Sequence, residues 1–161
     1  MALYNLHTLL YNAVLLMNAE QLEQTIRAGI PISAAMDFRV RALNALSIEV
    51  SGGAQENINV HHTAFAGSLY TICTLAAWGL THSVLPEACA LVMAKADIQY
   101  LRPVEGDIVA SAMLSEEQKI ALLDDLKAQR KARISIVVSI YHRQKLAVSF
   151  NAHMHVKHRQ S

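Results

Sequence analysis

Residues 57–86 read NINVHHTAFAGSLYTICTLAAWGLTHSVLP and contain no Asp, Glu, Lys or Arg. The length of this stretch would permit a membrane span, but its threonines, serines and histidines and its lack of Lys or Arg anchors argue against one. Outside a membrane, a helix that is apolar on all sides is a buried central helix. We therefore predict one long buried helix over about residues 63–84, ended by Pro86.

Alternating apolar and polar residues on both sides of this helix predict half-buried strands. Two such runs precede the helix and four follow it, at residues 36–42, 46–50, 91–101, 108–114, 134–140 and 146–156. An antiparallel sheet with one apolar face, wrapped on a single helix, is an α+β domain. The edges of such a sheet favour self-association.

The N-terminal segment is predicted to be helical. Residues 3–27 place apolar side chains at helical spacing, and Gly29 and Pro31 end the segment, which is either one helix or two. Residues 1–18 contain no Lys or Arg, so they lack the positive region of a secretory signal. This segment is therefore expected to belong to the folded domain.

A second helix is predicted to interrupt the strand series. Ser115 and Gln118 have the spacing of a capping box, in which the serine oxygen accepts an unpaired backbone N–H. We predict that this inserted helix covers about residues 115–130. Its apolar residues are Ile120, Leu123 and Leu126.

Length and composition indicate one domain over residues 1–161, of 17.7 kDa. The hydrophobic fraction of 53% and the charged fraction of 17% exclude a disordered chain. The net charge of +1 disfavours nucleic acid as a partner. The basic residues are scattered, apart from Arg130, Lys131 and Arg133 beside a predicted strand start.

The cysteines and the C-terminal histidines point to no metal. Cys73 and Cys89 form no CxxC pair and lie in apolar surroundings, which predicts reduced, buried thiols and a cytoplasmic location. His153, His155 and His158 have no acidic or cysteine partner nearby, so we interpret them as a solvated strand end.

The segment NVHHTAFAGSL at residues 59–69 resembles the loop and central helix start of hotdog-fold thioesterases. More closely, it is similar to a thioesterase domain family found as single-domain bacterial proteins or behind an acetyltransferase-type domain. IPIS at residues 30–33, ADIQYLRP at residues 96–103 and the Gly106-Asp107 pair agree with that family, so the resemblance covers the chain from about Gly29 onward. It implies a hotdog fold: an antiparallel sheet around one long helix.

The same resemblance implies partners and a substrate class. It implies a homodimer, or a dimer of dimers, with sites shared across the subunit interface. The substrate would be an acyl thioester of coenzyme A or of acyl carrier protein. No separate cofactor is expected, because coenzyme A or phosphopantetheine is part of the substrate.

Thioester hydrolysis needs a polarised carbonyl, a positioned water and an apolar slot. The first N–H groups of the central helix can meet the carbonyl oxygen, and the resemblance assigns this role to Ala66 and Gly67, with Ser68 beside them. Gly67 has the alternative role of permitting close helix–sheet packing. Phe65 is expected to line the acyl slot or the core.

The residue that activates water is left open by the sequence. The central helix has no carboxylate, and Thr74 stands where one thioesterase subgroup has an acid; its hydroxyl can orient water but is a poor base. Asn59 matches an asparagine that holds water or substrate in related enzymes, with loop capping as the alternative. His61 or His62 is a candidate base near neutral pH, with polar filling of the loop as the alternative.

Tyr100 and Arg102 end a predicted strand close to the helix start. Arg102 is a candidate ligand of the coenzyme A or phosphopantetheine phosphates, or else forms a surface ion pair. Because one fold hosts several chemistries, two other functions stay open. One is a non-catalytic module that binds an acyl thioester or dimerises, and the other is an acyl-thioester dehydratase or hydratase.

Overall fold

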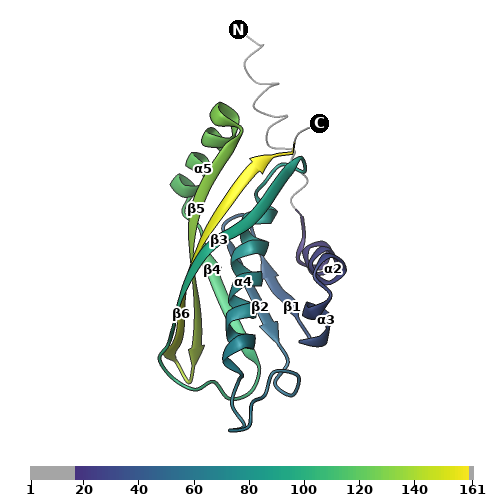
Figure 1. The fold of residues 1–161 in the computed structure, drawn as a ribbon, viewed down its shortest axis with the longest axis vertical. Helices are drawn as coiled ribbons and strands as arrows, with labels where there is room; N and C mark the ends of the chain where they lie inside the picture. Colours follow the sequence, from purple (N-terminus) through teal and green to yellow (C-terminus); the bar gives the residue numbers. More distant parts are fainter. Residues whose placement is uncertain (1–16, 160–161) are drawn as a thin grey trace.

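A six-stranded antiparallel sheet curves around helix α4, Ala66–Ser83, in the computed structural model, which describes residues 17–159 (Figure 1). The strand order is β1-β2-β4-β5-β6-β3. The strands are β1 Arg39–Leu43, β2 Ser47–Gly52, β3 Cys89–Tyr100, β4 Ile108–Met113, β5 Lys131–His142 and β6 Lys145–His158. The predicted α+β class and the hotdog architecture, a sheet wrapped around one helix, are thereby confirmed.

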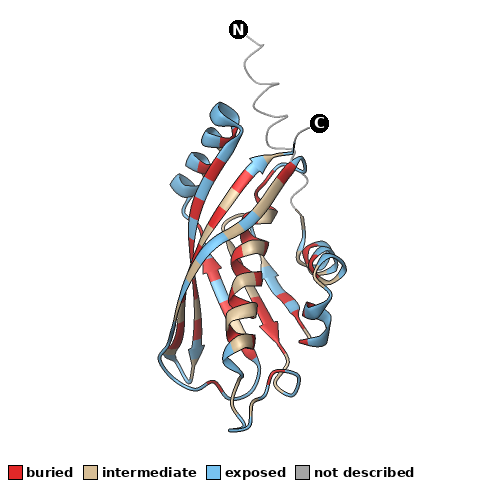
Figure 2. Ribbon diagram, in the orientation of Figure 1, coloured by how far each residue is buried: buried red, intermediate tan, exposed pale blue. Residues whose placement is uncertain are grey.

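Helix α4 is the centre of the core. Its buried side chains include Leu69, Ile72 and Leu80, and Figure 2 shows this helix largely buried within the curve of the sheet. A Cβ on Gly79 would lie 3.1 Å from Ile48 Cδ1 of β2, so the small residue permits a close approach of helix and sheet. No helix in residues 17–159 is long and apolar enough to cross a membrane.

Helix α4 begins three residues later than predicted. Residues 57–65 form a loop held by an isolated bridge between Ile58 and Ala64. The backbone N–H of Ala64 donates to Val104 O at 2.7 Å, and Phe65 has the extended backbone of an N-cap, with φ of −66° and ψ of 135°, so the helix begins only at Ala66. The helix end is close to the prediction, since Val84 is the C-cap.

Helix α2, Ala19–Gly29, is the described part of the predicted N-terminal helix; residues 3–16 of that prediction lie outside the described residues. Asn18 caps it by accepting from Gln21 N at 2.8 Å, and Leu22 and Ile26 are buried. The predicted stop at Gly29 is confirmed. A one-turn helix, α3 at Ile32–Ala35, follows and was not predicted, because four residues are too few to show a helical period.

Helix α5, Glu116–Gln129, confirms the predicted capping box: Gln118 N donates to Ser115 Oγ at 3.1 Å. Its predicted apolar face is wrong in part. Leu122 and Leu126, one turn apart, are buried, whereas Ile120 is 56% exposed. The helix lies beside the first half of β5, where β4 has already ended, so a single stripe of residues meets the sheet.

The faces of β6 are fixed by one aromatic contact. The rings of Phe150 and Tyr70 of α4 meet edge to face at 5.1 Å, so the even-numbered residues of β6 face α4. The odd-numbered residues, from Asn151 to Lys157, lie on the opposite face. Strand β3, next to β6, is an edge of the sheet and pairs with no other described strand.

Candidate functional site

The start of helix α4 presents unpaired backbone donors. Phe65 is the N-cap and provides no side-chain hydrogen bond, and the first internal bond runs from Leu69 N to Phe65 O at 3.0 Å. The N–H groups of Ala66, Gly67 and Ser68 therefore have no acceptor within residues 17–159. A helix N-terminus also carries a partial positive charge, so this turn can bind an oxygen that gains negative charge.

Asn59 organises the loop that leads into α4. Its Oδ1 accepts from His61 N at 2.8 Å and from Thr63 N at 3.3 Å, and its Nδ2 donates to Thr63 Oγ1 at 3.0 Å and to Ala64 O at 3.3 Å. Both ends of the amide are thus engaged within the loop. The geometry supports the loop-capping interpretation, and the predicted role of Asn59 toward water or substrate stays a prediction.

His61 and His62 lie exposed on the same loop. His62 adopts a left-handed backbone conformation with φ of 60°, which is uncommon for a residue other than glycine, asparagine or aspartate. In the described part of the chain, neither imidazole forms a hydrogen bond or ion pair, so both rings are free to reorient.

Asn57 is a residue that the sequence did not single out. It is buried, and its Nδ2 donates to Met36 O at 2.9 Å and to Gly53 O at 2.7 Å, which ties the loop to the segment before β1. Its backbone oxygen accepts from Phe65 N at 2.8 Å. Asn57 and Asn59 stand two positions apart in one uncharged stretch, and only the fold separates the buried anchor from the loop cap.

Tyr100 connects the end of β3 to the start of α4. Its hydroxyl donates to Ala66 O at 3.1 Å across the two elements. Burial raises the pKa of the phenol, and the neighbouring Cys73 and Tyr70 add to the rise. The hydroxyl therefore stays protonated at neutral pH and can keep donating this bond.

Phe65 explains why residue 67 is a glycine. A Cβ on Gly67 would overlap Phe65 Cε1 and lie 3.0 Å from Cζ. The ring, which is 55% exposed, thus covers the first turn of α4 at close range. Other large apolar side chains are exposed on the adjoining loop and strand end: Ile58, Val60 and Leu101.

Three of the predicted site residues, Arg102, Thr74 and Ser68, are bonded or buried within the fold. Arg102 donates from Nη1 to Leu146 O at 3.0 Å and forms no ion pair within residues 17–159, so it secures the loop after β3. Thr74 Oγ1 donates to Tyr70 O at 3.0 Å, and the residue lies roughly 12 Å along the helix from Ala66. Ser68 is buried. The substrate roles of these three residues stay predictions.

No carboxylate of the described chain forms a hydrogen bond with residues 57–68. At this end of the molecule, Asp107 accepts from Ala54 N at 3.1 Å and pairs with Arg41 at 3.1 Å. In residues 17–159 no group of three or more His, Cys, Asp or Glu side chains could hold a metal ion.

The family model described as "Putative thioesterase (yiiD_Cterm)" matches residues 19–158. Among solved structures, a protein described as a putative thioesterase from Shewanella oneidensis is 31% identical, with a TM-score of 0.78; the match covers 88% of this chain and 97% of that chain. A protein of unknown function from Chlorobaculum tepidum is 27% identical, with a TM-score of 0.84, covering 90% and 99% of the two chains.

A probable thioesterase from Pseudomonas aeruginosa shares the fold at 19% identity, with a TM-score of 0.78 over 87% of this chain and 95% of that chain. The shared architecture thus extends over most of each chain.

Proposed function

The chain belongs to the thioesterase family whose model spans residues 19–158, and on this premise we propose that it hydrolyses acyl thioesters of coenzyme A or of acyl carrier protein. The observation that carries the proposal is the first turn of α4. It offers three unpaired N–H groups, at Ala66, Gly67 and Ser68, beside exposed apolar side chains.

In the proposed reaction, water adds to the thioester carbonyl carbon and the carbonyl electron pair moves onto oxygen. The N–H groups at the start of α4 stabilise this oxyanion, an arrangement that contributes about 3 kcal/mol per donor in other enzymes. The carbon–sulfur bond then breaks, and the thiolate takes up a proton. The products are a carboxylic acid and a free thiol, and no cofactor beyond the substrate's own carrier is required.

The proposed water-activating groups are Asn59, His61 and His62. An imidazole nitrogen can accept a proton from water, so either histidine could serve as the base. Thr74 is a secondary candidate for orienting water. Since no carboxylate hydrogen-bonds to residues 57–68 in the described chain, we propose that the base comes from these residues or from a second subunit.

The acyl group is proposed to lie against the exposed apolar side chains of the loop and strand end, Phe65 among them. Tyr100 fixes the first turn of α4 through Ala66. Arg102 lies close to the same strand end, and its guanidinium has further donors for the phosphates of the carrier beyond the one that bonds Leu146 O.

A homodimer is proposed as the working assembly. Strand β3 is a 12-residue edge that pairs with β6 on one side and with no described strand on the other. An unpaired edge of this length is a template for pairing with a second copy. The free, buried thiols of Cys73 and Cys89 support a cytoplasmic location.

The test is release of free thiol from acyl-CoAs, from acetyl to palmitoyl, and from acyl carrier protein loaded with the same acyl groups. Asn59→Ala is compared with Asn44→Ala, a matched control, because Asn44 also caps a turn, accepting from Leu46 N and Ser47 N at 2.9 Å. Turnover by wild type and by Asn44→Ala, but not by folded Asn59→Ala, supports the proposal. No release from any thioester contradicts it.

No carboxylate in residues 17–159 hydrogen-bonds to residues 57–68, which favours one alternative, a module that binds an acyl thioester without cleaving it. Saturable binding of acyl-CoA without thiol release would support that function. Water addition to an enoyl thioester would instead identify a hydratase. That chemistry typically pairs a histidine with an acid, and neither His61 nor His62 has such a partner in residues 17–159.

A further inference from the structure

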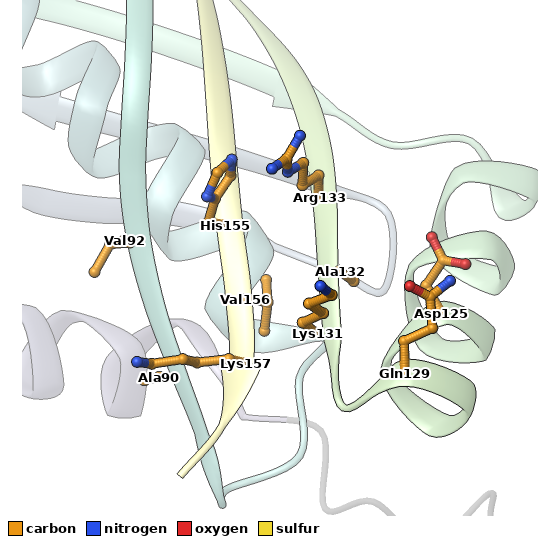
Figure 3. A pocket seen from close by; sticks show the side chains of 10 residues that line it. All are labelled: Ala90, Val92, Asp125, Gln129, Lys131, Ala132, Arg133, His155, Val156 and Lys157. Carbon is orange, nitrogen blue, oxygen red and sulfur yellow. The ribbon is translucent and has the colours of Figure 1, made fainter.

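A hollow of about 610 Å³ lies on the face of the sheet opposite α4, between the ends of β3, β5 and β6 and helix α5 (Figure 3). Its lining includes Lys131 and Arg133 of β5, His155 and Lys157 of β6, and Asp125 of α5. These strand residues alternate with buried ones, so they project away from α4. The volume is in the range of sites for small organic ligands.

Basic residues of this hollow lie opposite one another on the neighbouring strands β5 and β6. Lys131 lies directly across from Lys157, and Arg133 lies directly across from His155. Cross-strand neighbours have Cβ atoms about 5 Å apart, and like charges so placed destabilise a sheet. None of Lys131, Arg133 and Lys157 forms an ion pair with a carboxylate in residues 17–159.

The hollow is separate from the proposed catalytic site. Val92, which lines it, lies eight residues before Tyr100 on β3, or roughly 26 Å along the strand. The hollow also lies on the face of the sheet opposite α4. One ligand therefore cannot occupy the hollow and the first turn of α4 of the same chain.

We propose that this hollow binds a small phosphate-bearing ligand of nucleotide size, with the phosphates on Lys131, Arg133 and Lys157. A guanidinium matches phosphate oxygens in a bidentate way, and two ammonium groups add point charges around it. A bound dianion offsets the positive charge that these three residues place on this face of the sheet. Asp125 and Gln129, on the α5 side, offer acceptors and a donor for the uncharged part of the ligand (Figure 3).

The same phosphate chemistry has two sources, a free nucleotide or the nucleotide part of coenzyme A. Calorimetry on the full chain with pyrophosphate, ADP, ATP and coenzyme A distinguishes them. ADP or ATP binding more tightly than pyrophosphate, and at least as tightly as coenzyme A, assigns a free nucleotide, whereas pyrophosphate binding as tightly as ADP contradicts recognition of a nucleoside. Coenzyme A binding at least tenfold more tightly than ADP identifies the ligand as the nucleotide part of coenzyme A. The rate of hydrolysis of coenzyme A esters should then change when the hollow is occupied.

Three variants test the site. Lys131→Gln combined with Lys157→Gln should weaken binding at least tenfold, whereas Lys145→Gln, an exposed lysine at the opposite end of β6, should leave it unchanged. Asp125→Asn should tighten binding, because it removes the one carboxylate of the lining. If Asp125 had only a structural role, Asp125→Asn would not tighten binding.

Two results would overturn the proposal. One is no saturable binding of pyrophosphate, ADP, ATP or coenzyme A at millimolar concentration. The other is equal weakening by Lys145→Gln, which would indicate unspecific charge attraction. Asn59→Ala should leave ADP binding intact, so loss of thioester turnover and loss of this site are distinguishable.

Discussion

The Tyr100 hydroxyl donates a hydrogen bond of 3.1 Å to the carbonyl oxygen of Ala66. This bond joins the last residue of β3 to the first residue of α4, two elements whose contact residues are 34 positions apart in the chain. It therefore sets the position of the helix turn whose N–H groups are proposed to hold the thioester oxygen. Tyr100 acts as a positioning residue for that turn.

Tyr100→Phe should lower kcat about tenfold while leaving KM within roughly twofold, because a misplaced donor weakens the transition state more than the bound substrate. The lost hydrogen bond should cost about 1 kcal/mol of unfolding free energy. Tyr141→Phe is the control, since Tyr141 is an exposed tyrosine of β5. Equal kcat and KM for the two variants would show that Tyr100 does not position the first turn of α4.

Gly67→Ala should lower kcat/KM for thioester hydrolysis about tenfold or more. The new methyl group overlaps the Phe65 ring, so the ring must move across the first turn of α4. A second change, Phe65→Leu, makes room and should restore part of the activity. Gly29→Ala is the matched control, because a Cβ there meets nothing within 4 Å. If Phe65→Leu did not restore activity to Gly67→Ala, the role of Gly67 would be helix packing alone.

The sequence alone predicted the fold because its signals are local. The uncharged stretch at residues 57–86 indicated the central helix, and period-two alternation, clearest from Leu146 to Val156, indicated the strands. The face of α5 was harder: Ile120, Leu123 and Leu126 share an apolar character, and only packing against β5 shows that Leu122 is buried and Ile120 exposed.

The sites depend on contacts that no local pattern carries. Tyr100 and Arg102 stand two residues apart, yet one bonds to α4 and the other to Leu146. The run at Lys131 and Arg133 was visible in the sequence. Its opposition to Lys157 requires the register of β5 against β6, which single-sequence patterns do not specify.

His82 should act as a pH sensor that Trp78 reports. The two rings stack at 4.5 Å, and burial, with a smaller effect of Arg159, lowers the pKa of His82. Trp78 is the single tryptophan, so its fluorescence should change when His82 protonates, with a midpoint below 6.5. The His82→Gln variant should lose this transition. A midpoint above 6.5 would contradict the burial of the ring.

The same shift predicts a loss of stability in acid. The unfolded imidazole binds a proton near its ordinary pKa, whereas the folded one binds it only at lower pH. The contribution is therefore present above pH 6.5 and is lost as the pH falls through the folded pKa. Urea unfolding at pH 7, 6 and 5 should show a smaller loss for His82→Gln than for wild type.

Cys73 should be unreactive in the folded protein. Burial raises the pKa of its thiol to about 12, and the thiolate is the reactive form. In a Cys89→Ala variant, labelling by a thiol reagent at pH 8 should wait for unfolding. Above pH 9 the unfolded thiol ionises and the folded one does not, so stability should fall between pH 9 and about 12. Fast labelling at pH 8 in the folded state would contradict this burial.

The open edge of β3 should pair with a second copy of the chain, and Ala94 offers a way to block it. Met93 and Lys95 pair with Met154 and His153 of β6, and the bulge between them leaves Ala94 outside the register. A proline is tolerated at a bulge of an edge strand, where the ladder is already irregular, and it prevents a new strand from adding. Light scattering after gel filtration should give about twice 17.7 kDa for wild type and for the control Ala94→Ser, and a lower mass for Ala94→Pro.

An unchanged dimer in folded Ala94→Pro would place the interface elsewhere than on β3. If the monomer also lost thiol release, the partner subunit would be supplying the missing base at the start of α4.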